Sequence, residues 1–220
     1  MRMRVAMAVV AVCATACSST VSGDPKPAAA PAPQRIDAPL SSLLLDPAVF
    51  PARYSALVLP PQAVAQAAAD LTGVATGATV APDTCKPPGR PTGPDGTAMV
   101  VGTDNASRAT ISVELTRSER PLSVRRAQLA DCGEMTVTNS GATSTVRTEL
   151  LPPPTVRADD SVAIRQTVAS ASVQQTMTTL LAQVGDVRIA STFMTFRDTP
   201  PDTATLDEVF TKAVQRVHAG

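Results

Sequence analysis

The sequence predicts an α+β domain with a largely antiparallel sheet of about six to seven strands, flanked by helices. From Thr97 onward, apolar and polar residues alternate with a period of two, as on half-buried antiparallel strands. Helical patterns stand before, within and after this region, a mixture typical of α+β proteins. Some strand stretches are apolar on both faces, as at Met177, Leu180 and Leu181, so we expect helices on both sides of the sheet.

The first 17 residues have the layout of a lipoprotein signal. Two arginines precede a short apolar run, Val5 to Val12, and the small residues Ala14-Thr15-Ala16 precede Cys17. The run is far shorter than the roughly 20 residues that a membrane-spanning helix needs. We therefore expect cleavage after a signal peptide of residues 1–16 and acyl chains on Cys17 that hold the protein at the membrane. The alternative is an ordinary secretory signal cut nearby, which leaves Cys17 as a spare thiol.

Residues 17–39 are expected to form the lipidated N-terminus and a linker rich in Pro and Ala. The segment has almost no large apolar residue, and its prolines favour extended polyproline II. At about 3.1 Å per residue it would span up to roughly 70 Å. We expect a single extracytoplasmic domain over residues 40–220, a length compatible with one domain.

Two helices are predicted in the first two thirds of the domain. One is indicated over Gln62 to Leu71, where apolar residues recur at i, i+3, i+4 and i+7 from Val64, and Gly73 is placed to end it. The other is expected over Pro121 to Asp131, with proline at its favoured first position.

The clearest helix in the sequence is the last. One apolar stripe runs from Leu206 to Val217, and Thr205 and Glu208 have the spacing of a capping box at its start. Gly185-Asp186 is predicted to be a two-residue hairpin turn. The stretches with strand-like patterns are Tyr54 to Leu59, Met99 to Gly102, Ala109 to Thr116, Met135 to Thr138, Ser144 to Leu150, Val162 to Val168, Gln174 to Val184 and Val187 to Phe196.

Once Cys13 leaves with the signal and Cys17 carries lipid, Cys85 and Cys132 remain. Two leftover cysteines in an oxidising compartment predict a disulfide, which would add roughly 4 kcal/mol of stability as an upper value. A metal pair or a redox couple is the alternative. The absence of a Cys-x-x-Cys sequence and the distance to the single histidine argue against both.

Charge and composition exclude several function classes. The formal net charge is +0, which gives no footprint for nucleic acid. With 4 Phe, 1 Tyr and 0 Trp, recognition of sugars or bases by aromatic stacking has few platforms. No phosphate-binding glycine loop or HExxH sequence is found, and we expect no cofactor and no metal.

His218 is the only histidine, and we interpret it as a solvated cation near a helix C-terminus. That interpretation removes Ser-His-Asp and Cys-His catalysis and any site with several histidine ligands. Asp159-Asp160 could serve acid–base chemistry or bind a cation, but a solvated turn before a strand is the favoured interpretation. We therefore predict no catalytic residues and no enzymatic activity.

Four arginines cluster around the middle helix. They could bind an anionic lipid or a cell-wall phosphate, because guanidinium groups recognise phosphate. The acidic residues Glu119 and Asp131 lie nearby in sequence, so a surface of mixed charge is the favoured alternative. The four are Arg117, Arg120, Arg125 and Arg126.

The signal ending at Cys17, the Pro/Ala linker, the cysteine pair, the run of strands and the final stripe LDEVFTKAVQRV together resemble a known group. They are similar to the small extracytoplasmic lipoproteins of mycobacteria, the LprH-like and LpqN-like proteins. The domain also resembles the extracellular sensor domain of a mycobacterial serine/threonine kinase. The resemblance implies an antiparallel sheet flanked by helices and no established enzymatic activity. The kinase domain carries two disulfides, whereas this chain offers one pair.

These observations predict a non-catalytic binding or sensor-like lipoprotein on the extracytoplasmic face of the cell membrane. The ligand-binding residues remain unknown, and the ligand classes considered are a lipid and a cell-wall fragment. An aliphatic space beneath the helices would suit such a ligand, unless Ala-rich helices pack closely enough to close it. The alternative is an accessory or scaffold lipoprotein that stabilises another envelope protein without a small ligand.

The predicted anchor can be tested by changing Cys17→Ala. The variant should either leave the membrane or remain an uncleaved precursor, because the acyl acceptor is lost. Partition between detergent and aqueous phases measures this directly. The lipid interpretation is wrong if the unaltered protein enters the aqueous phase to the same extent as the variant.

Overall fold

The computed structural model describes residues 33–91, 95–171, 174–196 and 200–220. The predicted signal peptide, Cys17 and most of the predicted linker lie outside these residues. Within the described ranges, no helix is long and apolar enough to cross a membrane.

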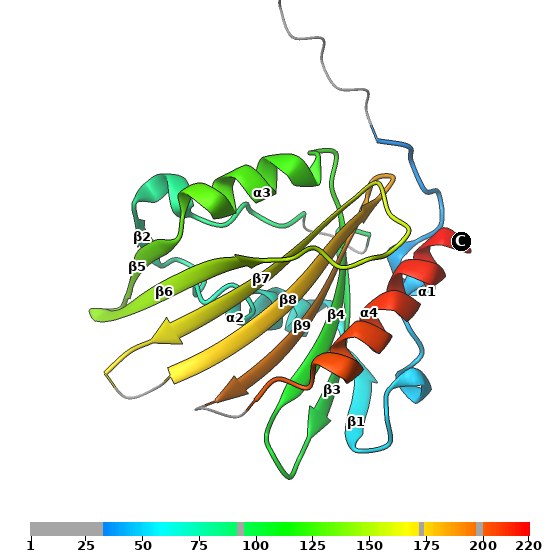
Figure 1. The fold of residues 1–220 in the computed structure, drawn as a ribbon, viewed down its shortest axis with the longest axis horizontal. Coiled ribbons are helices and arrows are strands. Elements are labelled where there is room, and N and C mark those ends of the chain that lie inside the picture. Colours follow the sequence, from blue (N-terminus) through cyan, green and yellow to red (C-terminus); the bar gives the residue numbers. More distant parts are fainter. Residues whose placement is uncertain (1–32, 92–94, 172–173, 197–199) are drawn as a thin grey trace, which may run out of the picture. The chain divides into compact units, whose positions relative to one another are not determined.

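All strands of the domain join one sheet, and every neighbouring pair is antiparallel (Figure 1). The order is β1-β3-β4-β9-β8-β7-β6-β5-β2, so the hairpin of the last two strands lies near the centre. The strands are β1 (Tyr54–Val58), β2 (Thr79–Ala81), β3 (Thr97–Asp104), β4 (Thr110–Arg117), β5 (Glu134–Asn139), β6 (Ala142–Leu151), β7 (Asp160–Ala169), β8 (Gln174–Val184) and β9 (Val187–Phe196).

The α+β class and the antiparallel sheet are confirmed, but the expected six to seven strands are too few, because the described sheet has nine. The strand that left no sequence signal is β2, which has three residues and a single buried one, Val80. Such a short edge strand cannot show a period of two. It is fixed instead by tertiary pairing with β5, in which Val80 lies opposite Val137.

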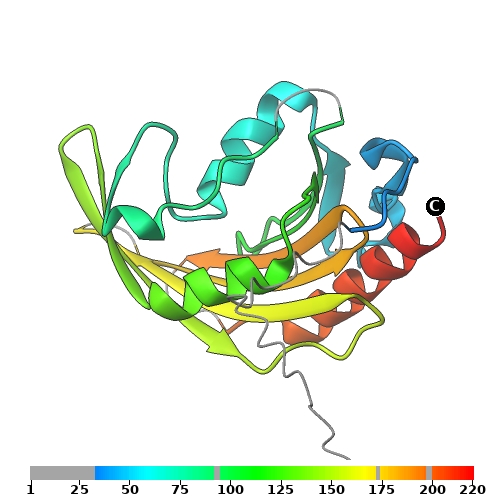
Figure 2. The same ribbon diagram turned by 90° about the horizontal axis from the view of Figure 1, so that it is seen from above.

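Helices cover both faces of the sheet, as the apolar pattern predicted (Figure 1). The sheet is strongly curved, with α2 inside its concave side and α4 outside (Figure 2). Helix α1 lies on the same side of the sheet as α4, and α3 lies on the same side as α2. Along a strand, residues that contact α1 or α4 alternate with residues that contact α2 or α3. The helices are α1 (Leu40–Leu43), α2 (Pro61–Asp70), α3 (Leu122–Asp131) and α4 (Thr203–His218), with short 3₁₀ turns at Pro47–Val49 and Asp83–Cys85.

The space between α4 and the sheet is filled by a continuous apolar core. The apolar stripe of α4 is at most 2% exposed, and Phe210 contributes its largest side chain. Phe193 of β9 and Phe50 lie in the same cluster. With Tyr54, four aromatic residues therefore fill the region where aliphatic side chains alone could have left a space.

Helix α4 begins earlier than its predicted capping box. Asp202 is the N-cap, and its Oδ1 accepts a hydrogen bond from the Thr205 amide at 3.2 Å. Thr205 and Glu208 lie inside the helix, where Glu208 pairs with Lys212 one turn on. The capping-box prediction is wrong because Asp202, directly after two prolines, offers an N-cap carboxylate one turn upstream.

The opposite face of the sheet is covered only in part. Val64 and Ala68 of α2 contact Met99 of β3, whereas Leu122 and Leu129 of α3 contact a cluster on β7. Between these two small clusters, the middle strands of the sheet carry polar side chains.

Cys85 and Cys132 form the predicted disulfide, with their Cα atoms 5.5 Å apart. The bond ties the end of α3 to the 3₁₀ turn that precedes the Pro-rich segment Pro87–Pro91. Gln128 of α3 adds two hydrogen bonds to the same region, from its Nε2 to the carbonyls of Thr84 at 2.8 Å and Lys86 at 3.0 Å. The helix and the Pro-rich segment are thus held as one unit.

The N-terminal segment of the domain is fastened to the central hairpin. Arg117 donates to the carbonyls of Ile36 at 2.7 Å and Ala38 at 2.6 Å, and to Asp186 Oδ1 at 3.0 Å. Asp186 Oδ1 also accepts from the Ile36 amide at 2.8 Å. At the predicted hairpin turn, Gly185 has φ +54, and a Cβ there would lie 2.2 Å from the Gln34 carbonyl oxygen. Only glycine permits this contact.

Gly73 tests how closely the chain after α2 packs against the sheet. Its φ is +69, and an added Cβ would meet Val168 Cγ2 at 2.6 Å and Val146 Cγ2 at 3.2 Å. We expect Gly73→Ala to lower the free energy of unfolding by about 2–4 kcal/mol, from left-handed backbone strain plus overpacking. Chemical denaturation measures the loss.

Gly77→Ala is the matched control. Gly77 has φ +82 but nothing lies within 4 Å of its added Cβ. Its cost should therefore be the backbone strain alone, about 1–2 kcal/mol. Equal losses of unfolding free energy in the two variants would show that the close contact between Gly73 and the sheet does not contribute.

Candidate functional site

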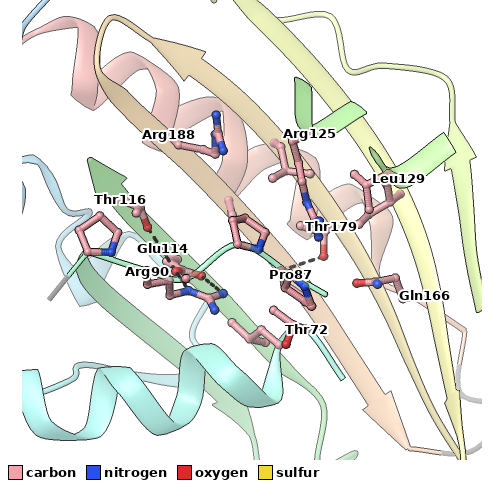
Figure 3. A pocket seen from close by; sticks show the side chains of 18 of the residues that line it. Thr72, Pro87, Arg90, Glu114, Thr116, Arg125, Leu129, Gln166, Thr179 and Arg188 are labelled. Carbon is pink, nitrogen blue, oxygen red and sulfur yellow. Dashed lines mark hydrogen bonds and ion pairs between the residues drawn. The ribbon is translucent and has the colours of Figure 1, made fainter. Parts of the chain in front are cut away.

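A cavity of about 200 Å³ lies on the face of the sheet that carries α2 and α3. Its floor is formed by β4, β9, β8 and β7, and its walls by α3, the end of α2 and the Pro-rich segment Pro87–Pro91. Arg90, Arg125 and Arg188 all line it, so we call it the arginine cavity (Figure 3).

The pleat of the central strands supplies the polar floor. On β9, Ile189 and Phe193 belong to the core beneath α4, whereas the alternating residues Arg188 and Thr192 line the cavity. The same alternation brings Glu114 of β4 to the floor. The remaining polar lining residues from the strands are Thr116, Arg117, Gln166 and Thr179.

Hydrogen bonds between neighbouring strands order this floor. The hydroxyls of Thr179 and Thr192 are 2.9 Å apart across the β8–β9 pair. Gln166 donates from Nε2 to Thr148 Oγ1 at 3.2 Å. The floor therefore presents hydroxyl and amide groups at fixed positions, set by strand pairing rather than by loops.

Glu114 and Arg90 form the ion pair of the cavity. The carboxylate is 7% exposed and accepts from Arg90 Nε at 2.5 Å and Arg90 Nη2 at 3.2 Å. The Thr116 hydroxyl donates to the same carboxylate at 3.3 Å. A buried carboxylate on a strand thus fixes an arginine that comes from an irregular segment.

Arg125 and Arg188 are held differently. Arg125 Nη1 donates to Gln128 Oε1 at 2.5 Å, and Arg188 donates to Gln183 Oε1 at 3.2 Å and the Arg120 carbonyl at 2.6 Å. Burial, together with the positive charges of Arg188 and Arg90, lowers the pKa of Arg125 to about 10. Burial also lowers the pKa of Arg188. Both guanidinium groups are therefore partly desolvated, and Arg125 also feels the positive charges of its neighbours.

A second cavity of about 680 Å³ adjoins the first. We call it the apolar cavity, because its lining is dominated by proline, alanine and valine, with Val64, Ala65, Ala69 and Val74 from α2 and the residues after it. The two cavities share Thr72 and the segment Pro87–Pro91 as lining. Its volume falls within the range of roughly 300–1,000 Å³ that is usual for ligand pockets.

The structure separates the four arginines that the sequence grouped together. Arg125 extends from α3 into the arginine cavity toward Thr179 (Figure 3). Arg117 borders the cavity but is engaged by Asp186 and the N-terminal segment. Arg126 forms an ion pair with Asp160, and the Arg120 carbonyl accepts from Arg188. The mixed-charge interpretation fits Arg126, whereas Arg125 belongs to the cavity.

The other candidates from the sequence lie apart from the cavities. His218 Nε2 lies 2.6 Å from the Arg157 carbonyl oxygen at an exposed position near the end of α4. Asp159 accepts from the Gly185 amide at 2.8 Å, and Asp160 is bound by Arg126. The two adjacent carboxylates thus have separate partners. In the ranges that the structure describes, no group of three or more His, Cys, Asp or Glu residues could hold a metal ion.

Sequence reasoning missed Arg90 and Arg188. Arg188 carries a signal, since it stands between the core residues Val187 and Ile189 on the polar face of a strand. Arg90 lies in an irregular segment rich in Pro and Gly, where no periodicity indicates direction. Only the fold brings it to Glu114.

No family model matches this chain, and no curated protein matches it. Among solved structures, one match is an uncharacterised protein of Mycobacterium smegmatis, the Rv0999 ortholog. It is 14% identical, with a TM-score of 0.45 over 77% of this chain and 92% of that chain. Another is the extracellular domain of PknH from Mycobacterium tuberculosis, 11% identical, with a TM-score of 0.42 over 66% of this chain and 79% of that chain.

With so few identical residues and TM-scores of 0.45 and 0.42, these matches carry no inference about the ligand or activity of this chain. The site is therefore interpreted from its own residues.

The ion pair in the arginine cavity predicts the effect of Glu114→Gln. The change leaves Arg90 as a third cation without a counter-charge, beside Arg125 and Arg188. We expect the free energy of unfolding to fall by about 1–3 kcal/mol, less than for a fully buried pair because Arg90 is 29% exposed. Chemical denaturation measures the change, and adding Arg90→Gln should restore most of it.

Glu149→Gln is the control, since Glu149 also pairs with an arginine on the sheet, Arg165, but both side chains are well exposed. Its effect should stay within about 0.5 kcal/mol. Similar losses for the two variants would refute a special electrostatic role for the cavity.

Proposed function

We propose that this protein is a non-catalytic, sensor-like binding domain, tethered to the outer face of the cell membrane through lipid on Cys17. The ligand occupies the arginine cavity and the apolar cavity on the α2 and α3 side. The observation that carries the proposal is the concave polar floor of the central strands, which is left uncovered between two helices and has Arg90, Arg125 and Arg188 among its lining arginines.

The chemistry of the lining supports binding rather than catalysis. Arginine, threonine and glutamine side chains hold a ligand through hydrogen bonds and charge. Glu114 is the carboxylate of the arginine cavity, and its oxygens are already occupied by Arg90 and Thr116. Catalysis would need a positioned base or nucleophile. The single histidine, His218, does not line either cavity and is bonded to the Arg157 carbonyl at the end of α4.

One observation favours the accessory role as a second candidate. Leu57 and Val58 of the edge strand β1 are 53% and 47% exposed. An edge strand with exposed apolar side chains can pair with another chain. A protein partner captured in cells by cross-linking at these two positions, with no bound small molecule, would favour this role.

Blocking the arginine cavity tests the proposed function. Ala190 of β9 lines its floor and is half-buried, so Ala190→Phe should fill the space without removing a charged group. We expect wild-type protein purified from its native membrane to carry a non-covalent ligand in native mass spectrometry. Ala190→Phe should lose that mass.

Ala106→Phe, at an exposed turn outside both cavities, is the control and should retain the ligand. Adding the recovered ligand at 100 times its dissociation constant should stabilise the wild type by about 2.7 kcal/mol. Retention of the same ligand by Ala190→Phe would place binding elsewhere and overturn the proposal.

A further inference from the structure

Among the described residues, Arg125 and Arg188 of the arginine cavity have no carboxylate as an ion-pair partner. Within the described ranges, the ion pairs of the lining arginines are Arg90 with Glu114 and Arg117 with Asp186. Arg125 and Arg188 form hydrogen bonds only to neutral oxygens of Gln128, Gln183 and the Arg120 backbone. The lining therefore keeps two unpaired positive charges.

Holding these charges close together is costly without an anion. Both guanidinium groups are partly removed from water, and the charge of Arg188 acts on Arg125. A protein that used the two residues only for structure would be expected to place a carboxylate between them. An anionic group bound there would relieve both the repulsion and the lost hydration.

The geometry of the groups selects among anions. A guanidinium fork binds the oxygens of phosphate in a bidentate manner. Thr179 lies on the floor beside Arg125 (Figure 3). Its hydroxyl and that of Thr192 share one hydrogen bond, which leaves one of the two hydroxyl protons to be donated to a ligand. A tetrahedral phosphate with several acceptor oxygens uses these donors from more than one side.

The apolar cavity extends the site in a different chemical direction. It adjoins the arginine cavity along Pro87–Pro91 and has more than three times the volume, about 680 Å³ against about 200 Å³. Its small side chains, Ala65, Ala69 and Val74 among them, leave room for a hydrocarbon body. A ligand that fills both spaces must carry an anionic head and an apolar tail.

We propose that the two cavities bind one phosphate-bearing amphiphile, with its phosphate on Arg125 and Arg188 and its hydrocarbon chain in the apolar cavity. This assignment rests on the proposed function and adds the chemical class of its ligand. A lipid headgroup and a soluble phosphate ester would both offer a phosphate to the arginines. The adjoining apolar cavity favours the lipid, because only the lipid has a hydrocarbon chain to fill it.

Three probes of matched structure test the assignment on the soluble domain, residues 33–220. They are a lysophosphatidic acid, the monoacylglycerol with the same acyl chain, and glycerol 3-phosphate. Titration calorimetry below the micelle concentration measures each affinity. We expect the phosphate-bearing lipid to bind at least tenfold more tightly than either other probe, since only it uses both cavities.

Variants assign the two ends of the ligand. Arg125→Gln and Arg188→Gln should each reduce the affinity for the phosphate-bearing lipid at least tenfold and leave that for monoacylglycerol unchanged. Arg126→Gln is the matched control on the same helix, because Arg126 is paired with Asp160 outside the cavity, and it should bind as the wild type does. Ala65→Phe, at an exposed position in the apolar cavity, should weaken both lipids and leave glycerol 3-phosphate unaffected.

Each other outcome overturns the assignment in a recognisable way. If the charged and uncharged lipids bind equally tightly, the arginines do not bind the phosphate. If glycerol 3-phosphate binds as tightly as the phosphate-bearing lipid, the apolar cavity does not bind the hydrocarbon chain. Binding of no probe removes the amphiphile altogether. The proposed function is decided separately by the ligand recovered from native membranes, so it survives if Ala190→Phe loses a ligand of another class.

Discussion

The structure depends on one constraint, the alternation of side chains along strands that are covered on both sides. Alternate residues of β4 (Ile111, Val113, Leu115) and of β9 (Val187, Ile189, Phe193) belong to the apolar core beneath α4, whereas residues between them line the concave side. Because the α4 side supplies most of the burial, the concave side can carry Glu114, Arg188 and the threonines. A shift of one residue in register would exchange the two faces and lose both the core and the cavity.

The disulfide adds precision to this arrangement. It joins α3 to the turn before Pro87–Pro91, so Arg125 and the wall shared by both cavities belong to one cross-linked unit. Gln128 reinforces that unit while also holding the Arg125 side chain. Helix α3 therefore fixes both the position of the Pro87–Pro91 wall and the direction of the Arg125 side chain. Glu114 and Arg188 are held by strands, and strands position side chains more precisely than loops do.

Sequence patterns predicted the fold better than the site, for physical reasons. Periodicity reports burial of a face, so it located α2, α3, α4 and the long strands, and the cysteine count gave Cys85–Cys132. It failed for β2, which is too short to repeat. Arg125 stands three residues after Leu122 and four before Leu129, so its place on the buried side of α3 was open to prediction. The partnership of Arg90 with Glu114 was not, because it joins an irregular segment to a strand.

The strand order also determines when the domain can assemble. Its middle is occupied by β8 and β9, which come late in the chain, and β4 gains its second neighbour only when β9 pairs with it. The N-terminal segment waits equally long, since Gln34 bonds to Asp186 after about 150 intervening residues. Contacts of such long range form slowly, because much chain entropy is lost before they are made. When the chain is delivered N-terminus first, its sheet therefore stays incomplete until nearly all residues are present. This property is compatible with passage across a membrane in unfolded form.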